Sequence, residues 1–430
     1  MPKFLPEVNA ALTLNSAWLR NRVAELGLKQ WWLAEQVGVD KKTVIRWMHG
    51  HVRSIQIGNA TALAAVLGCR IVDLELPRES VDLASVDDQR AAAALLATST
   101  LLDKLGPVGE WDVIERLLKA VAVPDLPLHV LGTLYHRLSI ACWRQDKLSE
   151  AEVYNGAAFD AGQRCGDKAL LAGAHSTRAN LLHWRGECAL AQQHCRDGLA
   201  LHRFIDGPAI AALHNNLGMS LYETGEFDAG ERELLAARAL YLLDGTPMQR
   251  SINYFALAFL ALRRGEVDAA QAHAQAAREH AALADYRRGI AMEALVRSDI
   301  HARRGESPQA LSALADGKAA FARLAIVEGI NFEFEGRVLR LLGRLGEAQR
   351  ALGEGLRVAA AFPVEAGWLQ HELVLTHRSR GDAAAARAAA NEAIALFERL
   401  GAPRMAGAAR SLVASMPPRV PVARDAKPLT

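Results

Sequence analysis

The sequence predicts an all-α protein in two parts, a small helical domain at the N-terminus and a long α-solenoid behind it. Between residues 16 and 76, short amphipathic stretches alternate with glycines at a spacing typical of helices joined by tight turns. From residue 128 onward, a pattern of small residues recurs every 38 to 40 positions, which is typical of stacked helical hairpins. The length of 430 residues also favours more than one compact domain.

Composition and charge favour an intracellular protein with one positive end. Hydrophobic residues make up 51% of the chain, which suffices for a packed core. No run approaches the roughly 18 apolar residues of a membrane span, and the N-terminus lacks the apolar centre of a signal peptide, so we expect a cytoplasmic location. Residues 1–76 hold nine Lys and Arg against six Asp and Glu, a net charge of +3, and the rest of the chain carries −1. Such a positive end suits contact with nucleic acid.

The cysteines and histidines predict neither a metal site nor a cofactor. The five cysteines are Cys69, Cys142, Cys165, Cys188 and Cys195. They form no C-x-x-C pair, and an odd number in a cytoplasmic chain favours free thiols. One metal-like cluster, formed by His183, Cys188, His194 and Cys195, does not have the spacing of a zinc site.

Taken in chain order, residues 1–15 carry two prolines and no helical period, so we expect an N-terminal arm. Residues 16–76 should form a domain of five short helices, in which the adjacent Trp31 and Trp32 cannot face the same core and should both be partly buried. Residues 77–90 are polar and acidic and should form a linker.

Within this domain, the stretch from Gln30 to Gly50 has the spacing of two helices that cross closely. Ala34 is small enough to let the second helix approach the first. Gly38 permits the left-handed backbone of a tight turn, and Val44 fills the corner between the helices. Amphipathic stretches at 17–26 and 57–67 flank the pair, as a helix-turn-helix domain requires.

The second helix of this pair should begin after Asp40, a good N-cap, and end near Met48, before Gly50. Its outward side chains are long donors and a hydroxyl, which suit an element that enters the DNA major groove. They are Lys41, Lys42, Thr43 and Arg46.

The pattern Q-x-x-x-A-x-x-x-G-V-x-x-x-x-V-x-x-W-x-x-G resembles the DNA-binding domain of Cro and phage repressors, the XRE family, over residues 16–76. The resemblance implies that Gln30 grips phosphate, that the first residues of the second helix touch bases and that His49 touches the DNA backbone. Two lysines stand where glutamine and serine are common, so the resemblance does not supply the base sequence. The expected DNA-binding residues are Gln30, Lys41, Lys42, Thr43, Arg46, His49 and Arg53.

Seven hairpins account for residues 128–400. Their turn residues are Asp146, Gly186, Gly225, Gly265, Gly305, Gly343 and Gly381. Five positions after each stands a small residue, in order Ala151, Ala191, Gly230, Ala270, Ala310, Ala348 and Ala386. Small residues at matched heights let two antiparallel helices approach closely. The pattern resembles the tetratricopeptide repeat, most closely in LHNNLGMSLYETGEFDAGERELLAARAL, with a period four to six residues longer than the usual 34.

The solenoid should extend over residues 91–416, with a degenerate repeat at 91–123 as a cap and a closing helix at 401–416; residues 417–430 form a tail that we expect to be disordered. Stacked hairpins of this type form a right-handed superhelix whose first helices line a concave face. Residues expected on that face and able to contact a ligand are His136, Asn180, His183, Asn215, Met219, Tyr222, Phe255, Phe259, Asp299 and Arg337. The asparagine amides could pair with the backbone of an extended peptide.

A helix-turn-helix of this type joined to such repeats resembles the peptide-sensing, quorum-sensing regulators grouped as RRNPP. The resemblance implies a homodimeric transcription regulator that binds an inverted-repeat operator on double-stranded DNA and a short peptide or protein in its groove. Two alternatives remain open. One is an interaction adaptor, or a mobile-element regulator, that a partner protein controls. The other is an enzyme, which we do not expect because the sequence shows no phosphate-binding glycine loop, metal constellation or nucleophile–base pair.

Overall fold

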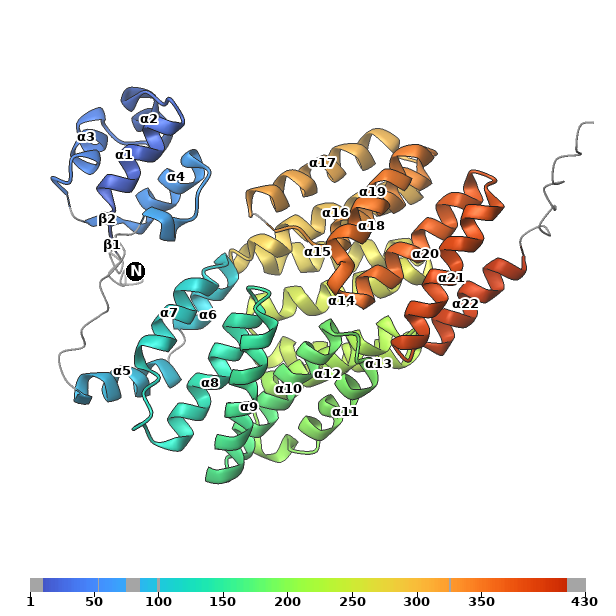
Figure 1. Ribbon diagram of the computed structural model, residues 1–430, viewed down its shortest axis with the longest axis horizontal. Coiled ribbons are helices and arrows are strands. Elements are labelled where there is room, and N and C mark those ends of the chain that lie inside the picture. The colour runs from blue at the N-terminus through green and yellow to red at the C-terminus, as the bar shows by residue number, and fades with distance from the viewer. Residues whose placement is uncertain (1–10, 53, 75–85, 99–100, 325, 416–430) are drawn as a thin grey trace, which may run out of the picture. The chain divides into compact units, whose positions relative to one another are not determined.

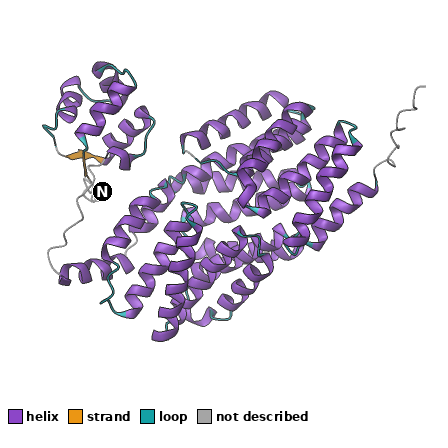
Figure 2. Cartoon of the chain, in the orientation of Figure 1, coloured by secondary structure: helices purple, strands orange, loops and turns teal. Residues whose placement is uncertain are grey.

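A computed structural model describes residues 11–52, 54–74, 86–98, 101–324 and 326–415, and the chain divides into two compact units between Asp88 and Gln89. Helix dominates both units (Figures 1 and 2), so the all-α prediction is confirmed. Among the described helices, none has both the length and the apolar character needed to cross a membrane.

The described residues 11–74 of the N-terminal unit form four α-helices and one short 3-10 helix. They are α1 (Ser16–Glu25), α2 (Gln30–Val37), α3 (Lys41–Met48), α4 (Ile57–Leu67) and η1 (Ile71–Leu74). One difference from the sequence-based expectation is a short antiparallel pair of strands, β1 (Ala11–Thr13) and β2 (Ser54–Gln56). The end of the expected arm is therefore a strand. Three residues are too few to show a periodic pattern, and the strand forms because Leu12 pairs with the buried Ile55.

The predicted pair of crossing helices is present in this unit. Gly38 has φ 75°, the left-handed backbone that the turn requires, and Val44 is fully buried between the helices. The Asp40 carboxylate accepts a hydrogen bond from the Thr43 backbone N–H at 2.8 Å, which caps α3 where the sequence predicts its start. The two tryptophans differ more than expected, since Trp31 is 57% exposed and only its neighbour is partly buried.

The boundary falls inside the first of three helices, which seven antiparallel pairs follow among the described residues of the C-terminal unit. The first three are α5 (Val86–Thr98), α6 (Leu101–Val108) and α7 (Trp111–Val121). The pairs are α8 (Leu128–Trp143) with α9 (Leu148–Cys165), α10 (Lys168–Trp184) with α11 (Cys188–Leu199), α12 (Gly207–Glu223) with α13 (Phe227–Asp244), α14 (Pro247–Arg264) with α15 (Val267–Leu283), α16 (Arg287–Arg303) with α17 (Ser307–Arg323), α18 (Gly329–Leu341) with α19 (Leu345–Val358) and α20 (Pro363–Ser379) with α21 (Ala383–Arg399). Short 3-10 turns, η2 (His202–Phe204) and η3 (Ala359–Ala361), follow α11 and α19, and α22 (Pro403–Ala414) closes the chain. The cap is thus three helices rather than one degenerate hairpin, and α5 begins inside the stretch expected as linker.

All seven predicted turn residues adopt a left-handed backbone, with φ from 59° at Asp146 to 82° at Gly225. The small residues five positions after each turn are buried, as the predicted close packing requires. In the third pair the backbones approach so closely that a Cβ atom on Gly218 would lie 2.9 Å from the Gly230 carbonyl oxygen. The helix heights predicted from the sequence are therefore confirmed.

The last repeats fold back onto the second and third. Helices α20 and α10 are in contact, and the rings of Trp184 and Phe362 meet edge to face with centroids 5.1 Å apart. Leu400 of the last turn lies against Gly186, and Met405 of α22 lies against Gly225. These contacts join segments about 180 to 210 residues apart in the sequence, so the first helices surround a central space.

Candidate functional site

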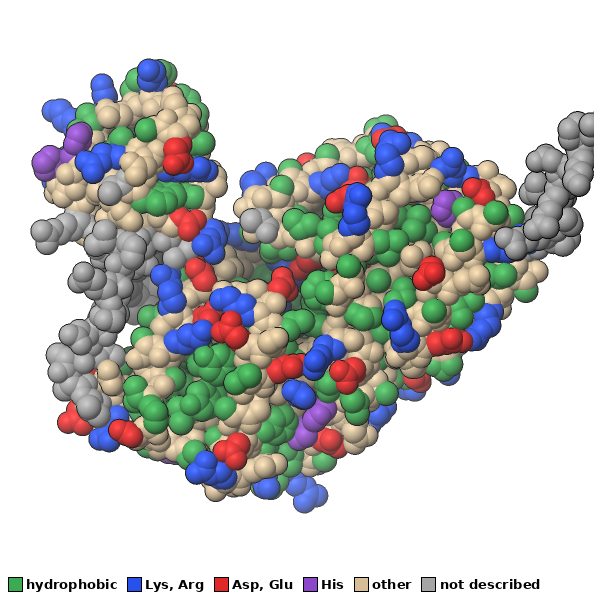
Figure 3. Space-filling view, viewed as in Figure 1, with side chains coloured by type: hydrophobic (Ala, Val, Ile, Leu, Met, Phe, Trp, Pro, Cys, Tyr) green, Lys and Arg blue, Asp and Glu red, His purple; other side chains and the backbone are tan. Residues whose placement is uncertain are grey.

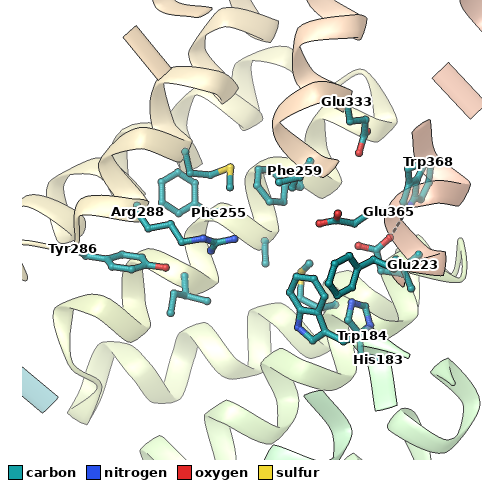
Figure 4. Close-up of a pocket in the computed structure, with 18 residues that line it drawn as sticks. His183, Trp184, Glu223, Phe255, Phe259, Tyr286, Arg288, Glu333, Glu365 and Trp368 are labelled. Atoms are coloured by element: carbon teal, nitrogen blue, oxygen red, sulfur yellow. Dashed lines mark hydrogen bonds between the residues drawn. The ribbon is translucent and has the colours of Figure 1, made fainter. Parts of the chain in front are cut away.

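A cavity of about 220 Å³ lies among the first helices of six consecutive pairs (Figure 4). Its lining residues come from α10 (His183, Trp184), α12 (Met219, Glu223), α14 (Ile252, Phe255, Ala256, Phe259), α16 and the residue before it (Tyr286, Arg288, Gly289, Met292), α18 (Ile330, Glu333) and α20 with the residue before it (Phe362, Val364, Glu365, Trp368). All of these described lining residues come from first helices or the residues just before them, as expected if the first helices line the concave face.

Aromatic and aliphatic side chains make up most of the cavity wall. Trp184 and Phe362 form one edge-to-face pair, and Phe259 packs against Phe334 behind the wall with ring centroids 5.7 Å apart. Trp368 stacks on Tyr222 at 5.8 Å, with the Arg263 guanidinium 3.7 Å from its ring centre. These rings are held by their neighbours, so the apolar surface is already in place before any ligand arrives.

Two acidic side chains at the wall have raised pKa values. Burial raises the pKa of Glu223 to about 8, although its carboxylate accepts a hydrogen bond from the Trp368 indole N–H. Burial likewise raises the pKa of Glu365 to about 7, and its carboxylate accepts a hydrogen bond from the Gly329 backbone N–H at 2.8 Å. The charge of Glu365 is among the causes that raise the pKa of Glu223.

The other charged groups of the wall are ion-paired. Arg288 makes two hydrogen bonds to Glu328, at 2.7 and 3.2 Å. Glu333 is held by Arg263 and Arg337. His183 carries no charge near neutral pH, because burial lowers the pKa of its imidazole to about 4.

A buried ionic network lies behind the wall and joins α14, α16, α18 and α20. Arg337 lies 3.0 Å from the Asp299 carboxylate and 3.2 Å from that of Glu372. Glu372 also accepts a hydrogen bond from Arg340 at 3.0 Å, and these arginines lower its pKa to about 2 against the effect of burial. The network holds α14, α16, α18 and α20 in fixed register with one another behind the cavity wall.

Four of the ten residues predicted for the groove line the cavity: His183, Met219, Phe255 and Phe259. Asn180 is partly buried on α10, outside this lining. His136 also lies outside it, and its Nε2 is 3.0 Å from the Thr177 hydroxyl, a hydrogen bond that joins α8 to α10.

The remaining four predicted residues, Asn215, Tyr222, Asp299 and Arg337, are buried between helices and lie outside the lining of this cavity. Asn215 accepts a hydrogen bond from Asn253 at 3.1 Å, so its amide is used inside the protein. The Tyr222 hydroxyl accepts one from Arg263 at 2.9 Å. The physical reason is that these four residues lie one or two helical turns along the same face from lining residues, where they bond to neighbouring first helices instead.

Sequence reasoning missed most of the polar residues of the cavity, including Trp184, Glu223, Arg288 and Glu365. Trp184 directly follows His183, and Glu223 directly follows Tyr222. A prediction that allowed a broader face of each first helix to line the groove would have included both. Glu365 lies at the start of α20 and reaches the cavity only because the last repeats fold back. No local sequence signal marks it.

On the N-terminal unit, Lys41, Lys42, Arg46 and His49 are exposed, and Figure 3 shows basic and histidine side chains gathered over α3. Thr43 is partly buried, and its hydroxyl donates to the Asp40 carboxylate at 2.9 Å, so it is engaged in capping α3. Gln30 is the first residue of α2 and is partly buried. Arg53 lies outside the described residues.

All five cysteines are free thiols. Burial raises the pKa values of Cys188 and Cys195 to about 12, which leaves both as unreactive neutral thiols. His194 does not join either cysteine. Its Nδ1 lies 2.9 Å from that of His175 on the neighbouring helix.

Neither a family model nor a curated protein matches the chain. Among solved structures, the chain is similar to a Rap protein complexed with competence and sporulation factor, with 16% identity, coverage of 76% of this chain and 98% of that one, and a TM-score of 0.52. It is also similar to aspartyl phosphate phosphatase F from Bacillus subtilis (11% identity, 95% and 97% coverage, TM-score 0.48). A third is PlcR from Bacillus thuringiensis in complex with the peptide PapR7 and DNA (11% identity, 63% and 95% coverage, TM-score 0.37). The first likeness shows the fold, and the C-terminal unit is a helical solenoid of the tetratricopeptide type.

Proposed function

We propose that the chain is a sequence-specific DNA-binding transcription regulator whose solenoid cavity binds a ligand that controls DNA binding. The observation that carries the proposal is the geometry of α2 and α3. A left-handed Gly38 turns the chain between two eight-residue helices, and α3 presents Lys41, Lys42 and Arg46 to solvent. A short helix with long basic donors on its outer face suits the major groove.

The start of α2 supports the same function. Lys29 occupies its N-cap position and supplies no side-chain hydrogen bond, so the first backbone N–H groups of α2 lack a side-chain cap. Uncapped N–H groups at a helix start favour a phosphate, and Lys29 and Gln30 stand beside them. In this proposal Gln30 and His49 contact the DNA backbone, while Lys41, Lys42 and Arg46 reach base edges. Thr43 contributes by holding the start of α3.

A regulator of this class would act as a homodimer on an inverted-repeat operator, with half-sites separated by one helical turn, about 34 Å, or a multiple of it. Ligand control would work through the relative positions of the repeats. Six consecutive pairs contribute to the cavity wall, so a ligand that contacts all of them favours one superhelical pitch. It shifts the DNA-binding equilibrium by its difference in affinity for the two pitches. The proposal assigns no catalytic step to the chain.

The test is a comparison of variants on an operator selected in vitro from random duplexes. Replacing Lys41, Lys42 and Arg46 by alanine should weaken operator binding at least about 100-fold, since each good contact to a base contributes about 1–3 kcal/mol. The slope of log affinity against log salt should fall in magnitude by up to about 3 if all three side chains neutralise phosphates. Helicity should remain that of the native chain.

The matched control is Arg70→Ala, which removes one exposed positive charge just before η1, an element that packs on α1 and α4. Its operator affinity should stay within about threefold of the native value. Equal losses in both variants would mean that general charge, not α3, attracts the DNA. Absence of salt-dependent binding to any duplex would support the alternative, an adaptor that binds a partner protein.

A further inference from the structure

The cavity combines an apolar wall with two carboxyl groups that form no ion pair in the described part of the chain. Glu223 comes from α12 and Glu365 from α20, and Figure 4 shows both at the cavity with Trp184 and Trp368. Among the described residues, no Lys or Arg forms an ion pair with either side chain, whereas Glu333 of the same wall is held by two arginines.

Each of the two carboxyl groups keeps free acceptor capacity. Glu223 receives one hydrogen bond, from the Trp368 indole, and Glu365 receives one, from the Gly329 backbone N–H. An ionised carboxylate offers about four lone-pair sites, so most of them remain unused on both residues. The charge of Glu365 raises the pKa of Glu223, so in this apolar setting a proton or another cation at the carboxyl groups relieves their repulsion.

We propose that this cavity binds an organic cation, an ammonium group attached to an aromatic or branched aliphatic body, with the ammonium held by Glu223 and Glu365. The inference rests on the proposed function, in which the cavity is the sensing site. The ammonium replaces the proton that the two carboxyl groups otherwise retain. The apolar body packs on Phe255, Phe259 and Trp184, and their ring faces attract the cation further.

Arg288 does not reverse this selectivity. Its guanidinium also points into the cavity in Figure 4, but Glu328 neutralises it through two hydrogen bonds. An anionic ligand would have to break that pair and would meet Glu223, Glu365 and Glu333 as well. The neutral His183 adds no positive charge near neutral pH. The charge balance of the wall therefore favours a cation.

Two sources offer this chemistry, a free amine and the amino terminus of a short apolar peptide. Three small probes of similar shape isolate the charge: 2-phenylethylammonium, 2-phenylethanol and phenylacetate. The peptide source is tested with Phe-Leu amide carrying either a free or an acetylated amino terminus. Calorimetric titration of the full-length protein should give an affinity for 2-phenylethylammonium at least about tenfold above that for the other two probes. If the source is a peptide, the free amino terminus should give a similar advantage over the acetylated one.

Binding should also depend on pH in a defined direction. The carboxyl groups must lose protons to hold the ammonium, so affinity should rise from pH 6 to about pH 8 and protons should be released. The charged groups that act on Glu223 are Arg263, Glu333 and Glu365, and those that act on Glu365 are Glu328, Glu333 and Arg288. Titrations in two buffers of different ionisation enthalpy count the protons released.

Glu223→Gln and Glu365→Gln keep an acceptor for Trp368 and for Gly329 but remove the negative charge. Each should reduce affinity for 2-phenylethylammonium at least about tenfold and leave 2-phenylethanol nearly unaffected. The matched control, Glu266→Gln, removes an exposed carboxylate outside the cavity and should leave the affinity for all probes unchanged. Thermal unfolding of each variant establishes that the fold is intact.

The inference is overturned if the alcohol or phenylacetate binds as tightly as the ammonium probe, if none of the probes binds up to 10 mM, or if both glutamine variants retain the native preference. Operator binding measured on the same samples separates this outcome from failure of the proposed function. Cation binding without operator binding would reject the regulator and keep the cation site. Operator binding without cation binding would reject the cation site alone.

Discussion

The indole nitrogen of Trp368 donates a hydrogen bond to the carboxylate of Glu223, although 145 residues separate them in the sequence. Trp368 also stacks on Tyr222 and lies under the Arg263 guanidinium, so one side chain joins α12, α14 and α20. The joint holds the seventh helical pair against the third and places Glu223 and Glu365 at one cavity. Both the stability of the superhelical turn and the chemistry of the cavity depend on it.

Trp368→Phe should retain much of the ring packing but remove the hydrogen bond to Glu223. We expect the free energy of unfolding to fall by about 1–3 kcal/mol, because a partly buried acceptor loses its partner. The pKa of Glu223 should rise further, since this bond lowers it in the native protein. Urea denaturation at neutral pH measures the loss. Trp184→Phe is the control, because no hydrogen bond of its indole is present among the described residues; an equal loss there would attribute the effect to ring size.

The raised pKa values of Glu223 and Glu365 predict a pH dependence of stability. In the folded protein these carboxyl groups keep protons that the unfolded chain has already lost above pH 4.5. Their contribution is therefore greatest below about pH 4.5 and falls as the pH rises to about 7 for Glu365 and about 8 for Glu223. Each lowers the free energy of unfolding by up to about 1.4 kcal/mol per pH unit within its window. The double variant Glu223→Gln, Glu365→Gln should lose less stability than the native protein between pH 5 and pH 8. Identical slopes would contradict the assignment.

The ionic network predicts a large cost for removing a single member. Arg337→Met leaves Asp299 and Glu372 without one of their cations in a buried setting. We expect a loss of about 3–5 kcal/mol, because uncompensated buried charge costs more than the pair contributes. Arg357→Met removes an arginine whose side chain is 75% exposed and should cost less than about 1 kcal/mol. Chemical denaturation of the two variants side by side tests the contrast, and similar losses would mean that the network is well solvated.

Two glycine substitutions, one in a repeat turn and one inside a helix, should change the stability of the protein in opposite directions. Gly265 has φ 80° with open space around it, so Gly265→Ala causes no clash. It should lower the free energy of unfolding by about 1–2 kcal/mol, the cost of a left-handed backbone for a residue with a Cβ atom. Gly353 lies inside α19, also in open space, and Gly353→Ala should stabilise the protein by about 0.5–1 kcal/mol. In thermal unfolding, the midpoint should fall for Gly265→Ala and rise for Gly353→Ala.

The sequence alone determined the parts of this protein that depend on neighbouring residues. Gly38, Asp40 and Val44 set the turn and the start of α3 through backbone conformation, capping and local packing. The repeated glycines and alanines set the height and closeness of each hairpin, because these contacts arise within about 20 residues. The concave face was predictable for the same reason, as far as which helices form it.

Only the tertiary structure decided which side chains reach the cavity. Asn215 and Arg337 lie one helical turn from the lining residues Met219 and Glu333, and their side chains bond to neighbouring first helices instead of facing the cavity. Glu365 reaches the cavity because the superhelix closes on itself. That closure depends on small rotations added up over several repeats, and no local pattern encodes their sum. The hairpins could therefore be predicted from the sequence, while the contact between Trp368 and Glu223 could not.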